Sequence, residues 1–388
     1  MKSISTMDTT LPTTQSVGLN DQADYNDSYS FSGLMYDYST FDPDGSFCHS
    51  KGPKFARDAT LLGIFFLVGF LGNCCLMMVI LSNPRLRTSA NILLTNLAMG
   101  DLLYVMVSGP FFLEHELHSC WQYGLAGCKL VNFTQVMVQG VCVYTLTALS
   151  IERYSVLVRG GTIRHGGRMR RGILSAVTVW FIAAVVASPI LVYAYVSGDG
   201  SPVCHYIQNF TRTAKVYEVA RAMVMYLLPL VIITFLYTVI AQTLLKSAGA
   251  FAGETQPGAR HFSARRRLAL TVLILALFFG IFWLPYYIFI VWFQLDHSSL
   301  VHMTGVAEFR NIYYFSALAN SCLNPIIIFS MSTSHRKALL TCVRCRKAED
   351  TTTTVAHTRS LANGIPGEKV KQPIDSRSGS RNTRCTEL

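Results

Sequence analysis

Residues 59–81 read ATLLGIFFLVGFLGNCCLMMVIL, a stretch that contains no Asp, Glu, Lys or Arg. A helix needs about 20 mostly apolar residues to cross the roughly 30 Å hydrocarbon core of a bilayer. The stretch therefore predicts a membrane-spanning helix. Six further windows of comparable length and apolar character lie at residues 89–113, 128–158, 172–196, 216–246, 268–295 and 309–331. Together the seven windows predict an all-α membrane protein, a bundle of seven transmembrane helices.

The composition also indicates a membrane protein. Charged residues make up 14% of the chain, against about 25% in an ordinary soluble domain. The formal net charge of +11 would favour nucleic-acid binding in a soluble protein. Here the basic residues stand in short runs between the apolar windows. We therefore interpret the charge as a topology signal and expect no nucleic-acid partner.

Lysine and arginine are concentrated in the loops on one side of the predicted bundle. Cytoplasmic loops of membrane proteins carry an excess of these residues. The pattern predicts a multi-pass plasma-membrane protein with its amino terminus outside the cell and its carboxyl terminus in the cytoplasm. The basic loops hold Arg85, Arg87, Arg159, Arg164, Arg168, Arg170, Arg171, Lys246, Arg260 and residues 265–267.

The apolar windows divide the chain into four parts. Residues 1–58 are polar and rich in Ser, Thr, Asp and Tyr, and we expect a disordered extracellular tail. Residues 59–331 hold the seven spans, with a short inner loop at 248–264. Residues 332–346 begin with a basic amphipathic run that predicts a short helix on the membrane surface. Residues 347–388 form a polar cytoplasmic tail, which we expect to be disordered.

Motifs in a fixed order run through the seven windows. They are Gly72-Asn73, the run from Asn96 to Asp101, Cys128, Glu152-Arg153-Tyr154, Trp180, Pro229, Tyr237, the run from Phe282 to Pro285, and the run from Asn320 to Pro325. Polar residues inside a membrane are costly, so each of these is a functional hypothesis. Any one motif alone is weak, but the ordered set resembles the rhodopsin-like, class A family of G-protein-coupled receptors across residues 59–346.

The resemblance implies a route of activation through the bundle. At rest Glu152 would pair with Arg153, which later faces a heterotrimeric G protein. Pro285 would kink the sixth helix beneath Trp283, because proline removes a backbone hydrogen bond. The alternatives are an arginine that snorkels to the membrane surface and a proline that serves packing alone. The same activation set includes Tyr154, Tyr237, Asn324 and Pro325.

A sodium site is also implied by the resemblance. Asp101 is the expected carboxylate ligand, and Asn320 and Asn324 supply the oxygen atoms that suit a hard cation. The chain departs from the family at Cys142, where a serine is common. The alternative is a poorer sodium site or none, and we expect no other cofactor.

Cysteines are expected to form disulfides on the outer side. The resemblance pairs Cys128, at the start of the third helix, with Cys204 in the second outer loop. Cys48 and Cys120 then remain, by elimination, as a second extracellular pair.

Other modification sites are predicted at both ends of the chain. Sequons at Asn26 and Asn209 predict glycosylation. Cys342 and Cys345 follow the expected surface helix and are candidates for palmitoylation, which would bring them into contact with membrane lipid.

Finer similarities lie at residues 128–130, 145–150, 267–269 and 320–322. They resemble the bombesin, endothelin and CCHamide-type neuropeptide receptors within the family. Gln135 stands where amine receptors carry an aspartate, so the carboxylate partner of a charged amine is absent. Leu318 stands where opsins carry the retinal lysine, which excludes a Schiff-base chromophore.

We expect a peptide pocket with aromatic walls and a few polar anchors. The basic residues typical of the bombesin group in helices six and seven are replaced by Phe293 and Tyr314. We therefore expect Arg221 or Arg310 to recognise the end group of the peptide. For each aromatic residue the alternative is ordinary packing between helices. The expected lining is Gln135, Gln139, Arg221, Trp283, Tyr286, Tyr287, Arg310, Tyr313 and Tyr314.

The sequence as a whole predicts a receptor for an extracellular neuropeptide that activates a G protein, with the phospholipase C and calcium pathway as first choice. Gly160 and Gly161 stand where the family usually carries a proline and a bulky apolar residue that docks into the G protein. A ligand-scavenging receptor that does not signal is therefore one alternative. A multi-pass transporter is another, but it would need charges along a central path. We expect no enzyme, because the His-Glu-Leu-His at 115–118 is one residue short of a zinc-site spacing.

The cytoplasmic tail offers sites for further partners. Hydroxyl residues at 351–354 and 376–380 could take phosphates for arrestin binding. The terminal Thr386-Glu387-Leu388 matches a ligand for a PDZ domain, which would add it as a strand to a sheet edge.

Overall fold

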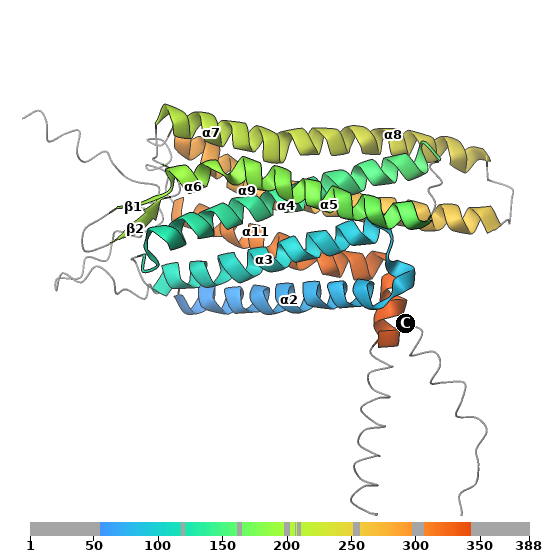
Figure 1. The fold of residues 1–388 in the computed structure, drawn as a ribbon, viewed down its shortest axis with the longest axis horizontal. Helices are drawn as coiled ribbons and strands as arrows, with labels where there is room; N and C mark the ends of the chain where they lie inside the picture. Colours follow the sequence, from blue (N-terminus) through green and yellow to red (C-terminus); the bar gives the residue numbers. More distant parts are fainter. Residues whose placement is uncertain are drawn as a thin grey trace, which may run out of the picture.

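The computed structural model describes residues 55–117, 121–160, 165–197, 202–205, 207, 211–250, 257–296 and 306–342. Within these residues seven helices are long and apolar enough to cross a membrane. Figure 1 shows them side by side, parallel to the long axis of the bundle. The predicted all-α bundle of seven transmembrane helices is thereby confirmed.

Single helices form the first, second, third, sixth and seventh spans, and composite helices form the fourth and fifth. The single helices are α2 (Phe55–Ser82), α3 (Ser89–Leu117), α4 (Gly124–Leu157), α9 (Pro257–Leu295) and α11 (Val306–Met331). A 3₁₀ turn, η1 (Pro84–Leu86), connects α2 to α3. Residues 333–342 form a further helix after α11. This helix fits the expected surface helix, and residues 343–346 lie outside the described part of the chain.

A proline interrupts the fourth span. The span consists of α5 (His165–Ala187) and α6 (Pro189–Tyr193), with Pro189 at the first position of the second piece. Proline is tolerated there because the first turn of a helix has no partner for its N–H. The predicted window was wrong at its end. Residues Tyr195–Ser197 form a strand, β1, that pairs antiparallel with β2 (Val203–His205).

The fifth span changes its helical pitch near its middle. It consists of α7 (Arg212–Ala222), a π-helical segment η2 (Met223–Leu227) and α8 (Leu228–Ala250). Pro229 lacks an N–H, and its ring would crowd the carbonyl of Met225, four residues earlier. The wider π turn relieves this crowding. It also adds one residue to the turn and so rotates the outer half of the span relative to α8.

The sixth span is longer than the sequence predicted. α9 begins at Pro257, within the stretch 248–264 that was expected to be a loop. Proline suits the first position of a helix, and no further proline interrupts the residues between it and the apolar run that begins at Leu268. Only residues 251–256 of the expected loop lie outside the described part of the chain.

Polar side chains join the spans at their centres, where lipid offers no hydrogen-bond partner. Asn96 in α3 donates from its Nδ2 to Thr145 Oγ1 in α4 at 2.8 Å. Trp180 in α5 donates from its indole N–H to Asn96 Oδ1 at 2.8 Å. In the first span, Asn73 Nδ2 donates to the carbonyl of Ser321 in α11 at 3.0 Å. The large apolar side chains at the outside, such as Leu67 and Phe235, are left to face lipid.

The first and seventh spans approach most closely at Gly72. A Cβ placed on Gly72 would lie 2.8 Å from Cγ of Pro325. The proline ring cannot rotate away, so any side chain at this position must push the two helices apart. By contrast, a Cβ on Gly63 in the same helix meets nothing within 4 Å.

We predict that Gly72→Ala lowers the thermal stability of the purified protein, whereas Gly63→Ala does not. Overpacking costs about 1–3 kcal/mol, and both variants make the same change in helix propensity. The measurement is the midpoint of thermal unfolding in detergent. Equal midpoints for the two variants would contradict the close contact between α2 and α11.

Candidate functional site

A cavity of about 110 Å³ lies between the second, third, fourth, sixth and seventh spans. It is lined by Tyr104, Asn132, Gln135, Val136, Gln139, Ile190, Trp283, Tyr286, Ile290, Tyr313, Tyr314 and Ala317. The expected pocket residues among these are Gln135, Gln139, Trp283, Tyr286, Tyr313 and Tyr314. An apolar cavity of about 150 Å³ holds one benzene molecule. The present cavity is therefore sized for the end group of a ligand.

Aromatic rings in mutual contact form much of the cavity wall. The ring of Trp283 meets Tyr104 and Tyr286 edge to face, each at 5.6 Å between centroids. Tyr314 stacks on Phe112 at 4.0 Å, and Tyr286 meets Tyr313 at 5.6 Å. These ring contacts join the second and seventh spans to the sixth across the cavity.

Two expected pocket residues, Arg221 and Tyr287, do not line the cavity. Arg221 is almost fully buried behind it and forms an ion pair with Glu218, which is completely buried. Nη1 of Arg221 also donates to Gln139 Oε1 at 3.3 Å. The guanidinium carbon lies 5.3 Å from the ring centroid of Tyr286 and 6.0 Å from that of Tyr287. Arg221 thus connects the third, fifth and sixth spans.

Glu218 was missed in the sequence, although a signal was present. It stands three residues before Arg221 in a membrane-spanning helix, and residues at that spacing share a helix face. Ionisable residues inside a membrane usually pair with one another. The two positions together therefore predict the ion pair that the structure contains.

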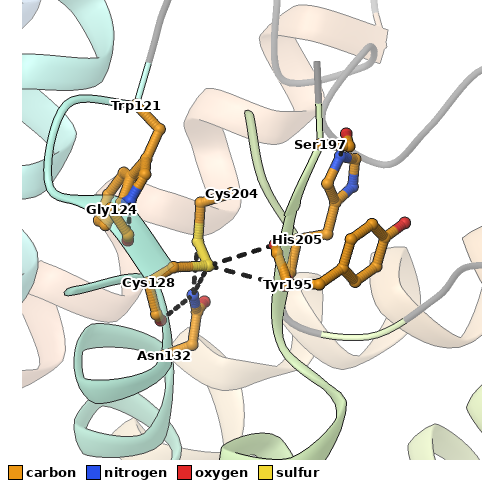
Figure 2. Close-up of a disulfide and its surroundings, with 8 residues drawn as sticks. All are labelled: Trp121, Gly124, Cys128, Asn132, Tyr195, Ser197, Cys204 and His205. Atoms are coloured by element: carbon orange, nitrogen blue, oxygen red, sulfur yellow. Dashed lines mark hydrogen bonds between the residues drawn. A yellow bond between two sulfur atoms is a disulfide. The ribbon is translucent and has the colours of Figure 1, made fainter. Parts of the chain in front are cut away.

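The outer hairpin is tied to the third span by the expected disulfide. Cys128 and Cys204 are bonded, with their Cα atoms 5.6 Å apart. Figure 2 shows Asn132 directly beside the bridge. Its Nδ2 donates to the carbonyl of Cys128 at 2.8 Å and contacts Sγ of Cys204 at 3.2 Å. Asn132, which the sequence did not assign to the pocket, therefore links the cavity wall to the disulfide.

A histidine stacks inside the same hairpin. The ring of His205 lies on Tyr195 at 4.7 Å, and Nε2 of His205 is 2.7 Å from Ser197 Oγ, as Figure 2 shows. Burial lowers the pKa of His205 to about 4, so the ring is neutral at physiological pH. The hairpin beside the cavity therefore carries no charge from this residue.

A polar cluster lies in the middle of the bundle, around Asp101. The fully buried carboxylate accepts from Asn324 Nδ2 at 2.7 Å, and the thiol of Cys142 donates to its other oxygen at 3.6 Å. The amide oxygen of Asn320 is buried, and the described residues give it no hydrogen-bond partner. A buried carboxylate and a buried amide oxygen without a partner are the kinds of ligand that a small hard cation prefers. Cys142 offers a soft sulfur in place of a further oxygen.

A further set of polar contacts lies at the opposite end of the bundle from the disulfide. Nη2 of Arg153 donates to Glu152 Oε2 at 3.0 Å, in the pairing that the resemblance implied. The hydroxyl of Tyr237 in α8 donates to the carbonyl of Ala269 in α9 at 2.9 Å. The ring of Tyr154 lies 5.5 Å from the guanidinium carbon of Arg159. Of these contacts, the hydrogen bond from Tyr237 holds the sixth span beside the fifth at this end.

The remaining predicted residues lie partly outside the described part of the chain. Pro285 and Pro325 lie inside α9 and α11. Cys342 ends the described chain and is partly exposed. Arg310 is on the second turn of α11, but its side chain is not described. The sites that fall wholly outside are Asn26, Cys48, Cys120, Asn209 and Cys345.

Comparison with known proteins agrees with this arrangement. The profile of the "7 transmembrane receptor (rhodopsin family)" matches residues 72–328. The neuropeptide CCHamide-1 receptor of Drosophila melanogaster is 32% identical over 343 residues, which cover 84% of this chain and 66% of that receptor. The chain thus spans just under two thirds of that relative's length.

Two bombesin-type receptors are similarly related. The [Phe13]-bombesin receptor of Bombina orientalis is 31% identical over 74% of this chain and 76% of its own. Bombesin receptor subtype-3 of Ovis aries is 29% identical over 74% of this chain and 75% of its own. These are receptors and not enzymes. The seven spans, the disulfide, the inner arginine motif and the matched profile together show that the chain belongs to the rhodopsin family of seven-transmembrane receptors.

Proposed function

We propose that the protein is a receptor for an extracellular peptide and that it activates a heterotrimeric G protein. The observation that carries the proposal is the sixth span, α9. One part of it forms the cavity wall through Trp283 and Tyr286, and another accepts the hydrogen bond of Tyr237 at Ala269. A ligand in the cavity and a partner at the inner end would therefore act on the same helix. The similar receptors are named for neuropeptides, which supports a peptide ligand.

The orientation follows from the chemistry of the two ends. The disulfide between Cys128 and Cys204 lies at the end near the cavity, and disulfides persist in oxidising compartments. Cys342, at the other end, is a free thiol. Both features support an outer cavity, an extracellular amino terminus and a cytoplasmic carboxyl terminus in the plasma membrane.

Activation is a shift between two states of the bundle. A ligand shifts the equilibrium only by as much as it binds one state more tightly than the other. The ligand would favour a state in which α9 moves at Pro285, its inner end leaves Tyr237, and Arg153 becomes accessible. The G protein would then dock at Arg153. The same proposal includes coupling to the phospholipase C and calcium pathway, binding of arrestin and of a PDZ domain, and palmitoylation at Cys342 and Cys345.

The second candidate function is that of a receptor that scavenges its ligand without signalling. The observation that favours it concerns Gly160. This residue lies in the turn that follows the third span and has a φ of +63°, a conformation that costs roughly 1–2 kcal/mol for other L-residues. The glycine therefore serves the turn, and with Gly161 it leaves the inner loop without the bulky apolar residue that the family usually presents. No comparable observation favours a transporter.

We predict that a peptide from a neuropeptide library raises calcium or changes cyclic AMP in cells expressing the protein, and that Arg153→Ala abolishes this response. Arg153 is buried and paired at the inner end, so its loss removes the docking site without touching the cavity. Arg170→Ala, which removes an exposed inner arginine, is the matched control. Surface expression of both variants is measured with the response.

Two results would count against signalling. A full response in Arg153→Ala at normal surface expression would contradict the proposed role of the arginine. Uptake of a bound peptide, without nucleotide exchange on any G protein, would favour the scavenger.

We propose further that Asp101, Asn320 and Asn324 hold a sodium ion that favours the inactive state. We predict that sodium weakens agonist binding about fivefold or more, a typical coupling between sites, and that Asp101→Asn removes this effect. The measurement is agonist affinity in sodium chloride and in choline chloride at equal ionic strength. Equal affinities in the two salts for the unaltered protein would show that Cys142 has left the cluster unable to hold the ion.

A further inference from the structure

Glu218 is a buried charge that takes no part in the activation route described above. It lies in α7, is completely buried, and accepts from both Nε and Nη2 of Arg221 through its Oε2 atom. Removing one partner of such a pair leaves an uncompensated charge in a medium of low dielectric constant. Glu218 and Arg221 therefore form a unit with no net charge.

This unit fixes the orientation of a cavity residue. Nη1 of Arg221 donates to Gln139 Oε1 at 3.3 Å. Arginine has no acceptor atom, so this contact identifies the oxygen end of the glutamine amide. The Nε2 atom of Gln139 is then the end of the amide that does not contact Arg221. It is buried, has no hydrogen-bond partner among the described residues, and belongs to a side chain that lines the cavity.

A second unpaired donor lines the same cavity from another helix. The indole Nε1 of Trp283 in α9 is also buried without an acceptor among the described residues. A buried donor without an acceptor is costly. A ligand that brings an acceptor oxygen to Gln139 and Trp283 would satisfy both donors and would connect the third span to the sixth.

A single aromatic ring, that of Tyr286, separates the charge of Arg221 from the cavity. Its guanidinium carbon is 5.3 Å from the ring of Tyr286, which lines the cavity. Without Glu218, that cation would attract a carboxylate. With Glu218 in place the described residues offer the cavity no net charge, and burying a carboxylate against them would be strongly unfavourable.

We propose that Glu218 determines the charge of the ligand group that the cavity accepts. By neutralising Arg221, it makes the space between Gln139 and Trp283 a site for an uncharged hydrogen-bond acceptor, such as a carbonyl oxygen, and excludes a carboxylate. The inference rests on the proposed function, in which this cavity binds the agonist. Glu218 acts through Arg221 and is therefore a residue that sets specificity without touching the ligand.

The test uses two small probes with the same branched chain, methyl isovalerate, which is uncharged, and isovalerate, which is an anion one methyl group smaller. Each carries one short branched chain and one acceptor group, in keeping with a cavity of about 110 Å³. Binding to the purified full-length protein in nanodiscs is measured from the dependence of the unfolding temperature on probe concentration. We expect the ester to bind at least about tenfold more tightly than the acid, which corresponds to about 1.4 kcal/mol.

Three variants separate a role in specificity from a role in folding. Glu218→Gln leaves Arg221 uncompensated, and the preference should reverse toward the acid by about tenfold or more. Glu218→Asp keeps the charge and should keep the preference for the ester. Gln139→Leu removes a donor at similar volume and should lose the stabilisation by the ester.

Several outcomes would overturn the proposal. They are equal affinities of the unaltered protein for the two probes, no stabilisation by the ester, and ester binding unaffected by Gln139→Leu. None of these depends on the stability of Glu218→Gln, and an unchanged preference in that variant would also overturn it. The assay contains no G protein, so a failure of the signalling proposal would leave its result unchanged.

Discussion

The hydrogen bond between Asp101 and Asn324 joins two helices at residues that are 223 positions apart in the chain. A carboxylate at the centre of a lipid-spanning bundle cannot be hydrated by bulk water, and it persists only where neighbouring helices bring polar groups to it. Cys142 from the third span and Asn324 from the seventh meet this need. The arrangement of the second, third and seventh spans depends on this contact.

The other spans are placed by similar polar contacts, since apolar burial gives little preference for protein over lipid. Asn96 holds the third and fourth spans to the second. Arg221 holds the fifth and sixth to the third at the outer end, and Tyr237 holds the fifth to the sixth at the inner end. Each of these polar contacts involves only a few atoms, so its donor and acceptor can form a different contact in another arrangement of the helices. A bundle held in this way can have two packings that differ little in free energy.

The sixth span is central to this behaviour because it takes part in both outer and inner contacts. At the outer end it provides Trp283 and Tyr286, which share ring contacts with the second and seventh spans. At the inner end, Ala269 accepts the hydrogen bond from Tyr237 of the fifth span at its backbone carbonyl, and Val272 and Leu275 pack in the core. Pro285 lies at the level of the cavity contacts, between Trp283 and Tyr286, and lacks the donor that would stiffen the helix. The backbone of the sixth span is therefore weakened beside the cavity.

Much of the fold could be predicted from the sequence, because a membrane demands long apolar windows and these are visible without tertiary information. The ends of the spans were less accurate. Pro257 begins a helix where a loop was expected, and the fourth window ran into the strand at Tyr195. Propensity and hydropathy are averages over a window, so they do not locate a single turn. The π segment at Met223 was also missed, although Pro229 supplies its physical cause.

The residues that line the cavity were predicted in part. The errors in that prediction have a common reason. Resemblance to known receptors identified the aromatic residues, because these stand next to recognisable motifs such as Trp283 and Pro285. It gave no partner for Arg221, which was expected to meet the ligand and instead meets Glu218. Asn132 was not assigned to the pocket, and its contact with the disulfide depends on a cysteine 72 residues away in the chain. Contacts between distant segments are decided by packing and leave only weak signals in the sequence.

The central claim is that occupation of the outer cavity changes the position of the inner end of the sixth span. The most direct measurement is the distance between spin labels on the inner ends of α4 and α9, recorded by pulsed electron resonance in nanodiscs. The predicted result is a short distance in the free protein and a longer one when an agonist and a G protein are both bound. An unchanged distance in the presence of an agonist that drives nucleotide exchange would contradict it.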